Sequence, residues 1–124
     1  MKKIHTDKAP AAVGPYSQAI AAGNLLFLSG QIALDPEKGE LVGSTVAEQT
    51  EQICKNIKAV LEASGTDIES VVKTCCFLTD MAAFGEFNEI YGKHFTGKPA
   101  RSCVAAAALP KGALCEVECI ALLK

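Results

Sequence analysis

The hydrophobic pattern of the chain switches between a strand-like and a helix-like period. Apolar and small residues fill positions 17–22 and 25–29, which flank Gly23-Asn24, a two-residue loop typical of a β-hairpin. Residues 71–79 are apolar or β-branched without a helical period, which predicts a strand buried on both faces. Residues 102–108 and 114–123 predict two further strands joined by a turn.

Helical periods occur between these strands at two places. Thr45 and Glu48 have the spacing of a capping box, so we expect a helix to start there and to end before Gly65. Asp80 can cap a second helix. Each helix carries an apolar stripe at spacings of three and four: Ile53, Ile57, Val60 and Leu61 in the first, and Phe84, Phe87, Tyr91 and Phe95 in the second.

This order of elements predicts one α+β domain over residues 1–124, with two helices on one face of a sheet. Residues 115–123 alternate so that one face of the last strand is apolar, while the other carries Glu116 and Glu118 together with two aliphatic side chains. Because the helices cover only one side of the sheet, we expect a second copy of the chain to cover the other. The pattern therefore predicts a homo-oligomer.

Composition narrows the classes of function. The 12 Lys and Arg residues are outnumbered by 14 Asp and Glu, and no long basic run occurs, which argues against a nucleic-acid partner. The polar N-terminus and the short apolar runs argue against a signal peptide or membrane span, so we expect a cytoplasmic protein. The six cysteines contain no Cys-x-x-Cys pair, and we expect them to be small buried apolar residues rather than disulfides or metal ligands.

Two charged residues are the strongest candidates for chemistry, since no phosphate loop, nucleotide fingerprint, serine elbow or metal-ligand spacing is present. Arg101, held by Pro99-Ala100 before an uncharged strand, could bind a carboxylate, or it could be a solvated charge. Glu116 could orient a water molecule, or it could form an ion pair between subunits. Ser29 and Gly30 could contact a ligand or form a plain turn.

The chain resembles the RidA (YjgF) family of reactive-intermediate deaminases over almost its whole length. The resemblance rests on five segments: Gly14-Pro15-Tyr16-Ser17-Gln18-Ala19, Ser29-Gly30-Gln31-Ile32, the Asn88 and Tyr91 pair, Pro99-Ala100-Arg101-Ser102-Cys103-Val104, and Leu109-Pro110 with Glu116-Val117-Glu118. It implies a chorismate-mutase-like fold, with a six-stranded mixed sheet and two helices on one face. It also implies a homotrimer with a central barrel and a cleft at each subunit interface.

The activity that the resemblance implies is hydrolysis of enamines and imines, such as 2-aminoacrylate, 2-iminopropanoate and 2-iminobutanoate, to 2-oxo acids and ammonia. These substrates are released by pyridoxal-phosphate dehydratases, and no metal or cofactor is implied. Arg101 would bind the substrate carboxylate and Glu116 would position water. The remaining substrate-binding positions would be Tyr16, Ser29, Gly30, Asn88 and Cys103.

Two departures from the family pattern leave the substrate range open, and two other functions stay as alternatives. Lys98 stands where many members carry an aromatic residue, and residues 105–108 are unusually small. Members of the family have also been described as single-strand endoribonucleases or translation inhibitors. The third hypothesis for the function is a non-catalytic protein that binds small ligands.

Overall fold

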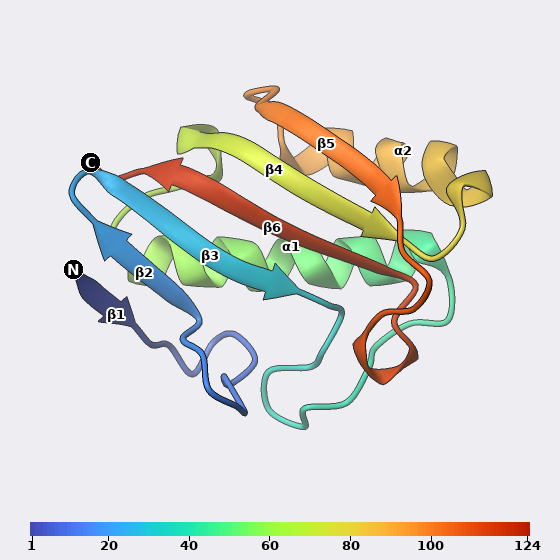
Figure 1. The fold of residues 1–124 in the computed structure, drawn as a ribbon, viewed down its shortest axis with the longest axis horizontal. Helices are drawn as coiled ribbons and strands as arrows, with labels where there is room; N and C mark the ends of the chain where they lie inside the picture. Colours follow the sequence, from blue (N-terminus) through green and yellow to red (C-terminus); the bar gives the residue numbers. More distant parts are fainter.

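The sheet is built around the hairpin that Gly23-Asn24 predicts. The computed structural model describes residues 1–124. Its strands are β1 (Lys2–Ile4), β2 (Ala19–Ala22), β3 (Leu25–Gln31), β4 (Val71–Leu78), β5 (Ala100–Ala105) and β6 (Cys115–Leu122). They lie in the order β1-β2-β3-β6-β4-β5, and every neighbouring pair is antiparallel except β4 and β5 (Figure 1).

The first helix, α1 (Val46–Ala63), confirms its predicted start and its apolar stripe. The Thr45 side chain accepts a hydrogen bond from the Glu48 main-chain N–H, and the Glu48 carboxylate accepts one from the Thr45 N–H, which completes the capping box. The four stripe residues of α1 are fully buried. Each such aliphatic side chain contributes about 1.5–3 kcal/mol on burial, so the stripe is what fixes α1 on the sheet.

The second helix, α2 (Phe84–His94), starts later than Asp80 predicts. Asp80 caps a short 3-10 turn, η2 (Met81–Ala83), by accepting a hydrogen bond from the Ala82 N–H. The aromatic stripe is confirmed, because Phe87, Tyr91 and Phe95 are buried against the sheet. Two further 3-10 turns, η1 (Ile68–Ser70) and η3 (Pro110–Gly112), precede β4 and β6.

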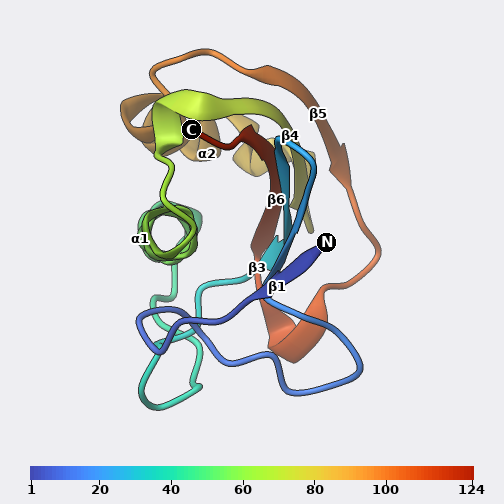
Figure 2. The same ribbon diagram turned by 90° about the vertical axis from the view of Figure 1, so that its left-hand side faces the viewer.

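Both helices lie on the same face of the sheet, and the opposite face is open (Figure 2). Alternation along β6 places Cys115, Val117, Cys119 and Ala121 in the core and Glu116 and Glu118 on the open face. The open face also carries the partly exposed side chains of Phe27, Val104 and Leu122. The α+β prediction, with two helices on one face of a six-stranded mixed sheet, is therefore confirmed.

Strand β3 runs to Gln31, two residues beyond its predicted end, and the strands differ from the prediction in three further places. Strand β1, with two exposed lysines on the edge of the sheet, has no apolar signal in the sequence. Strand β2 begins at Ala19 rather than at residue 17, because the Gln18 side chain bonds to the main chain of the preceding loop. Strand β5 starts at Ala100, so Arg101 lies inside it, and it ends at Ala105 because its partner β4 ends at Leu78.

The cysteines follow their predicted role as packing residues. Cys54, Cys76, Cys115 and Cys119 are buried, Cys75 and Cys103 are half-buried, and all six are free thiols. Cys75 and its neighbour Cys76 face opposite sides of the sheet, as the period of a strand requires. Neither α1 nor α2 combines the length and apolar character that crossing a bilayer requires.

Candidate functional site

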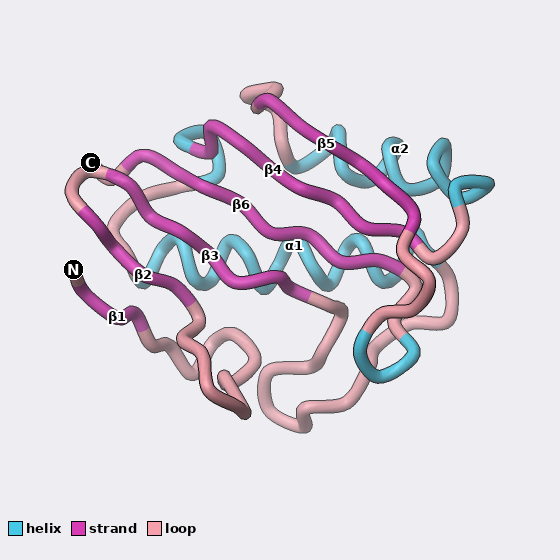
Figure 3. The backbone as a smooth tube through the Cα atoms, in the orientation of Figure 1, coloured by secondary structure: helices cyan, strands magenta, loops and turns pink.

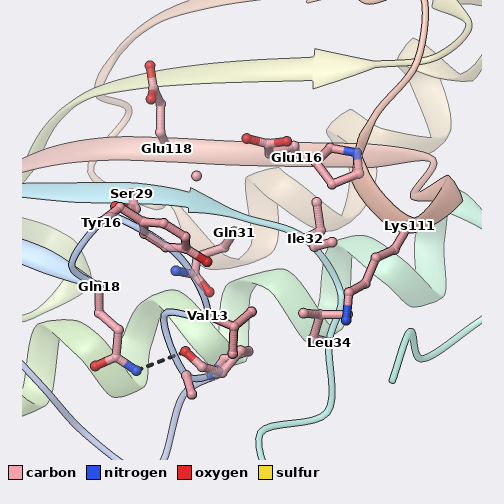
Figure 4. A pocket seen from close by; sticks show the side chains of 14 residues that line it. Val13, Tyr16, Gln18, Ser29, Gln31, Ile32, Leu34, Lys111, Glu116 and Glu118 are labelled. Carbon is pink, nitrogen blue, oxygen red and sulfur yellow. Dashed lines mark hydrogen bonds between the residues drawn. The ribbon is translucent and has the colours of Figure 1, made fainter. Parts of the chain in front are cut away.

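A cavity of about 540 Å³ lies where β3 and β6 meet three loops, at the edge where the loops gather in Figure 3. From β3 and β6 come Ser29, Gly30, Glu116 and Glu118. The loop before β2 contributes Val13 and Tyr16, both labelled among the side chains that line the cavity in Figure 4. The other lining residues are Pro10, Ala11, Gln18, Gln31, Ile32, Leu34, Pro110 and Lys111.

Glu116 is the carboxylate best placed for chemistry in this cavity. It is half-buried and forms no ion pair within the chain. Burial raises the pKa of Glu116, and the neighbouring negative charge of Glu118 raises it further. A carboxyl group whose pKa is raised in a cavity has the property expected of a general acid or base.

A β-bulge brings Gly30 against Glu116. Three residue steps of β3, from Leu28 to Gln31, oppose only two steps of β6 at this point. A Cβ atom added to Gly30 would lie 2.1 Å from the Glu116 Oε2 atom, so only glycine leaves room for the carboxylate as it stands. Ser29 adjoins the bulge, and its Oγ donates a 2.6 Å hydrogen bond to the Ser17 carbonyl, which fixes it to the loop before β2.

Buried amide side chains hold the loops around this cavity. Gln18 donates to the carbonyls of Thr6 and Pro10 at 2.9 Å each, and it accepts from the Thr6 N–H at 2.7 Å. Gln49 of α1 accepts a 2.9 Å hydrogen bond from the Leu114 N–H, next to the turn η3. Because these side chains satisfy loop main-chain groups, they set the position of the cavity walls.

The Asn56 side chain holds the loop after β3 in place, because it donates a 3.0 Å hydrogen bond to the Leu34 carbonyl. Sequence patterns alone do not identify this role for Gln18, Gln49 or Asn56. The sequence feature that could identify them is a polar residue in an apolar setting. Gln49 and Asn56 lie on an otherwise apolar helix face, and Gln18 lies at the start of an apolar strand.

Arg101 lies in a second cavity, of about 510 Å³, between the start of β5 and α2. Its Nη1 donates a 2.7 Å hydrogen bond to the Asn88 Oδ1. The guanidinium carbon lies 4.9 Å from the ring centre of Tyr91 and 5.4 Å from that of Phe84, which are cation–π distances. The Tyr91 hydroxyl is in turn hydrogen bonded to the buried Thr74 hydroxyl at 2.7 Å. Residues of α2 therefore position the guanidinium while leaving it without a carboxylate partner.

The thiol of Cys103 is not placed as a nucleophile. Burial raises the pKa of Cys103 above its ordinary value, and the nearby positive charge of Arg101 only partly opposes this. Burial also raises the pKa of Tyr91 to about 12. Both groups are thus protonated at neutral pH, and they serve as packing and hydrogen-bonding groups.

The two halves of the predicted site lie on opposite faces of the sheet. Arg101 pairs with Thr74 of β4, which is buried on the helix side, whereas Glu116 pairs with Phe77, three residues further along β4. Side chains an odd number of residues apart on one strand point to opposite faces. One chain therefore brings Tyr16, Ser29, Gly30 and Glu116 together, and separately Asn88 and Arg101, with Cys103 further along the same face of β5.

No group of three or more His, Cys, Asp or Glu side chains gathers anywhere in the chain as a metal site would require. The charges of the two cavities differ in sign. The first is lined by two carboxylates and one lysine, the second by Lys98 and Arg101 with no carboxylate. One chain therefore carries an anionic cavity on one face of the sheet and a cationic cavity on the other.

Comparison with known proteins places this geometry in a family. Residues 6–123 match the family described as Endoribonuclease L-PSP. The chain is 55% identical over 121 residues to a chloroplastic Reactive Intermediate Deaminase A of Arabidopsis thaliana. The matched residues make up 97% of this chain and 65% of the Arabidopsis protein. It is 48% identical over 122 residues to the 2-iminobutanoate/2-iminopropanoate deaminase of Mus musculus, covering 98% and 90% of the two chains.

Solved structures agree with these relatives. A protein from Thermotoga maritima described as a putative endoribonuclease superposes with a TM-score of 0.96 at 49% identity, covering 100% of this chain and 98% of that one. E. coli TdcF, solved with bound serine, gives a TM-score of 0.93 at 38% identity and covers 100% of both chains. With the matched residues spanning nearly its whole length, this chain belongs to the Endoribonuclease L-PSP family, the family of the RidA reactive-intermediate deaminases.

Proposed function

We propose that this protein hydrolyses 2-imino acids, such as 2-iminobutanoate and 2-iminopropanoate, to 2-oxo acids and ammonia. The observation that carries the proposal is the half-buried, unpaired carboxyl group of Glu116, enclosed with Tyr16, Ser29 and Gly30 in a cavity of about 540 Å³. The names of the Arabidopsis and mouse relatives support the same chemistry.

In the proposed reaction, an enamine first takes a proton on carbon to become the protonated imine. Arg101 and the main chain at Cys103 bind the substrate carboxylate, and Glu116 takes a proton from a water molecule whose oxygen attacks the imine carbon. Glu116 returns this proton to the nitrogen of the resulting carbinolamine. The C–N bond then breaks to release ammonia while the carbinolamine hydroxyl gives its proton to Glu116, which leaves the 2-oxo acid. Because an iminium carbon is already electrophilic, positioning of substrate and water supplies most of the rate.

We further propose that the working site forms between protomers of a homotrimer. Within one chain Arg101 and Glu116 lie on opposite faces, so a single protomer cannot present both to one small substrate. Strand β5 is an unpaired edge, and the open face carries Phe27, Val104 and Leu122, exposed by 41%, 50% and 43%. An interface that covers these apolar groups can also place the cationic cavity of one chain beside the anionic cavity of the next.

Ribonuclease activity is the alternative that the family's description raises. RNA binding would require several phosphate contacts from lysines and arginines. The chain carries a formal charge of −2, and the cavity that contains Glu116 is lined by two carboxylates and one lysine. The electrostatics thus favour a small substrate over a polyanion.

The deciding experiment measures 2-oxobutanoate released when a dehydratase generates 2-iminobutanoate in the presence of the purified protein. We expect the wild type to exceed buffer by orders of magnitude. Arg101→Gln should lose about 100-fold or more, since it removes a charge-assisted pair of hydrogen bonds. Lys55→Gln, an exposed charge change on α1 that lines neither cavity, is the matched control.

A wild type no faster than buffer, or an Arg101→Gln variant as fast as Lys55→Gln, would overturn the proposal. RNA cleavage that persists through purification and disappears in Arg101→Gln would favour ribonuclease activity as the function. Light scattering should give about three times the protomer mass of 13.0 kDa, and a monomer would contradict the trimer.

A further inference from the structure

The cavity around Arg101 contains a second cation that the proposed reaction does not use. Lys98 and Arg101 both line this cavity of about 510 Å³, and none of its other lining residues, Asn88, Tyr91, Gly92, Phe95, Thr96 and Pro99, is acidic. Neither cation takes part in an ion pair within the chain. Two like charges that face one cavity without a counter-charge repel each other, and an anion bound there relieves this repulsion.

Lys98 is held in a defined and unfavourable backbone conformation. Its φ of 52° lies in the left-handed region, which costs a residue other than glycine about 1–2 kcal/mol. The Lys98 N–H donates a 3.2 Å hydrogen bond to the Phe95 carbonyl, and Pro99 follows directly. A strained residue that its neighbours hold in place is a feature of ligand-binding sites.

An acidic side chain from another segment, Glu69 of η1, contacts the loop that carries Lys98 but does not line the cavity. Glu69, which precedes β4, accepts a hydrogen bond from the Thr96 hydroxyl, and it is not among the residues that line the cavity. A Cβ atom at Gly97 would lie 3.4 Å from the Glu69 carbonyl oxygen and 3.6 Å from its Oε2 atom, so Glu69 lies directly against this loop. The Lys98 ammonium forms no ion pair within the chain, and Lys98 lines the cavity.

We propose that Lys98 binds a second acidic group of the substrate, so that the site accepts 2-imino dicarboxylic acids. The first carboxylate is bound by Arg101, and the distal carboxylate of a four- or five-carbon chain is bound by the Lys98 ammonium. The cavity volume is within the range of about 300–1,000 Å³ typical of small-molecule sites. That the bound dicarboxylate is an imine rests on the proposed function, whereas recognition of two carboxylates rests on the two cations alone.

The test compares two stable 2-oxo acids of equal length by titration calorimetry on the intact protein. 2-Oxopentanoate has one carboxylate and 2-oxoglutarate has two. We expect the wild type to bind 2-oxoglutarate about fivefold more tightly, the effect of one added charge pair at a partly exposed site. The difference should shrink at 1 M salt, because screening weakens exposed pairs.

Lys98→Asn is the informative variant, since asparagine tolerates the left-handed conformation and removes the ammonium group. We expect it to bind both acids equally, with unchanged affinity for 2-oxopentanoate, and Lys98→Arg to restore the preference. Lys93→Gln, a charge change on the last turn of α2 outside the cavity, is the control and should keep the wild-type preference.

Equal affinities in the wild type, or an unchanged preference in Lys98→Asn, would overturn this inference. If 2-iminobutanoate is turned over but the preference is absent, this inference fails and the proposed function stands. If the preference depends on Lys98 but no imine is turned over, the binding of dicarboxylates stands and the proposed function fails.

Discussion

Gly30→Ala is the sharpest test of the cavity that contains Glu116, because it adds one methyl group beside one carboxylate. The alanine Cβ would lie 2.1 Å from the Glu116 Oε2 atom, 3.0 Å from its Cδ and 3.3 Å from its Cγ. The backbone at Gly30 does not have the positive φ that would itself penalise a side chain. The substitution therefore acts on the position of Glu116 and not on the course of β3.

The size of this displacement can be worked from the distances. An ordinary van der Waals contact begins at 3.4 Å, so an oxygen at 2.1 Å must retreat by about 1.3 Å. Moving a catalytic group by about 1 Å can reduce turnover about 100-fold. The free energy of unfolding should change little. Rotating the half-buried Glu116 side chain away from its rotamer costs about 0.5–1.5 kcal/mol. Alanine offsets about 0.4–1 kcal/mol of this cost, because it lowers the conformational entropy of the unfolded chain relative to glycine.

The assay is release of 2-oxobutanoate under saturating and limiting substrate, together with a urea melt of each variant. Gly85→Ala is the matched control, because nothing lies within 4 Å of the position its Cβ would take. We expect a loss of about 100-fold in kcat for Gly30→Ala and wild-type turnover for Gly85→Ala. Turnover within threefold of wild type in Gly30→Ala would refute the argument that the position of the Glu116 carboxylate controls the rate.

Two further predictions concern pH. Glu116→Gln should lower deaminase turnover by about 10²–10⁴-fold, the usual contribution of a general acid or base, and it should raise the melting temperature at pH 7. Because burial raises the pKa of Glu116, the folded chain holds this proton more tightly than the unfolded chain, so stability falls as pH rises from the ordinary value of 4.5 through the folded pKa. The glutamine variant should lack this fall in circular-dichroism melts between pH 4 and pH 8; a parallel pH profile would contradict the assignment. The hydrogen bond from His94 lowers the pKa of Glu51. This hydrogen bond therefore stabilises the folded state fully above pH 4.5, the ordinary pKa of a glutamate, and the stabilisation is lost as pH falls through the lowered pKa. Glu51→Gln should melt lower than wild type at pH 6 and converge with it in acid, and a constant difference down to pH 2 would count against the coupling.

Local patterns in the sequence predicted most of the fold because the physics behind them is local. The capping box at Thr45 and the buried stripe of α1 both depend on residues three or four apart. The short edge strand β1 could not be found this way, because Lys2 and Lys3 are exposed and the strand is defined by its pairing with β2. The end of β5 at Ala105 was missed for a similar reason, since it is set by the length of β4.

The candidate site was only partly accessible from the sequence. Arg101 and Glu116 stand out as charges within apolar strands, but their spacing along the chain says nothing about which face each side chain occupies. That depends on the pairing of β4 with both β5 and β6. Lys98 was visible only as an unusual residue before Pro99, and its cavity becomes apparent once α2 and β5 lie side by side.

The separation of Arg101 from Glu116 within one chain prevents the two charges from pairing with each other. A guanidinium and a carboxylate placed in one buried cavity would pair with each other, and substrate would then have to break that pair. Here Arg101 is held by the Asn88 amide and by two aromatic rings, while Glu116 is held beside Gly30 with no cation bonded to it. Each charge is positioned by groups that do not neutralise it. In the homotrimer that we propose, the interface would bring the two charges together only in the assembled protein, where the substrate that we propose would meet Arg101 with its carboxylate and Glu116 with its cationic imine.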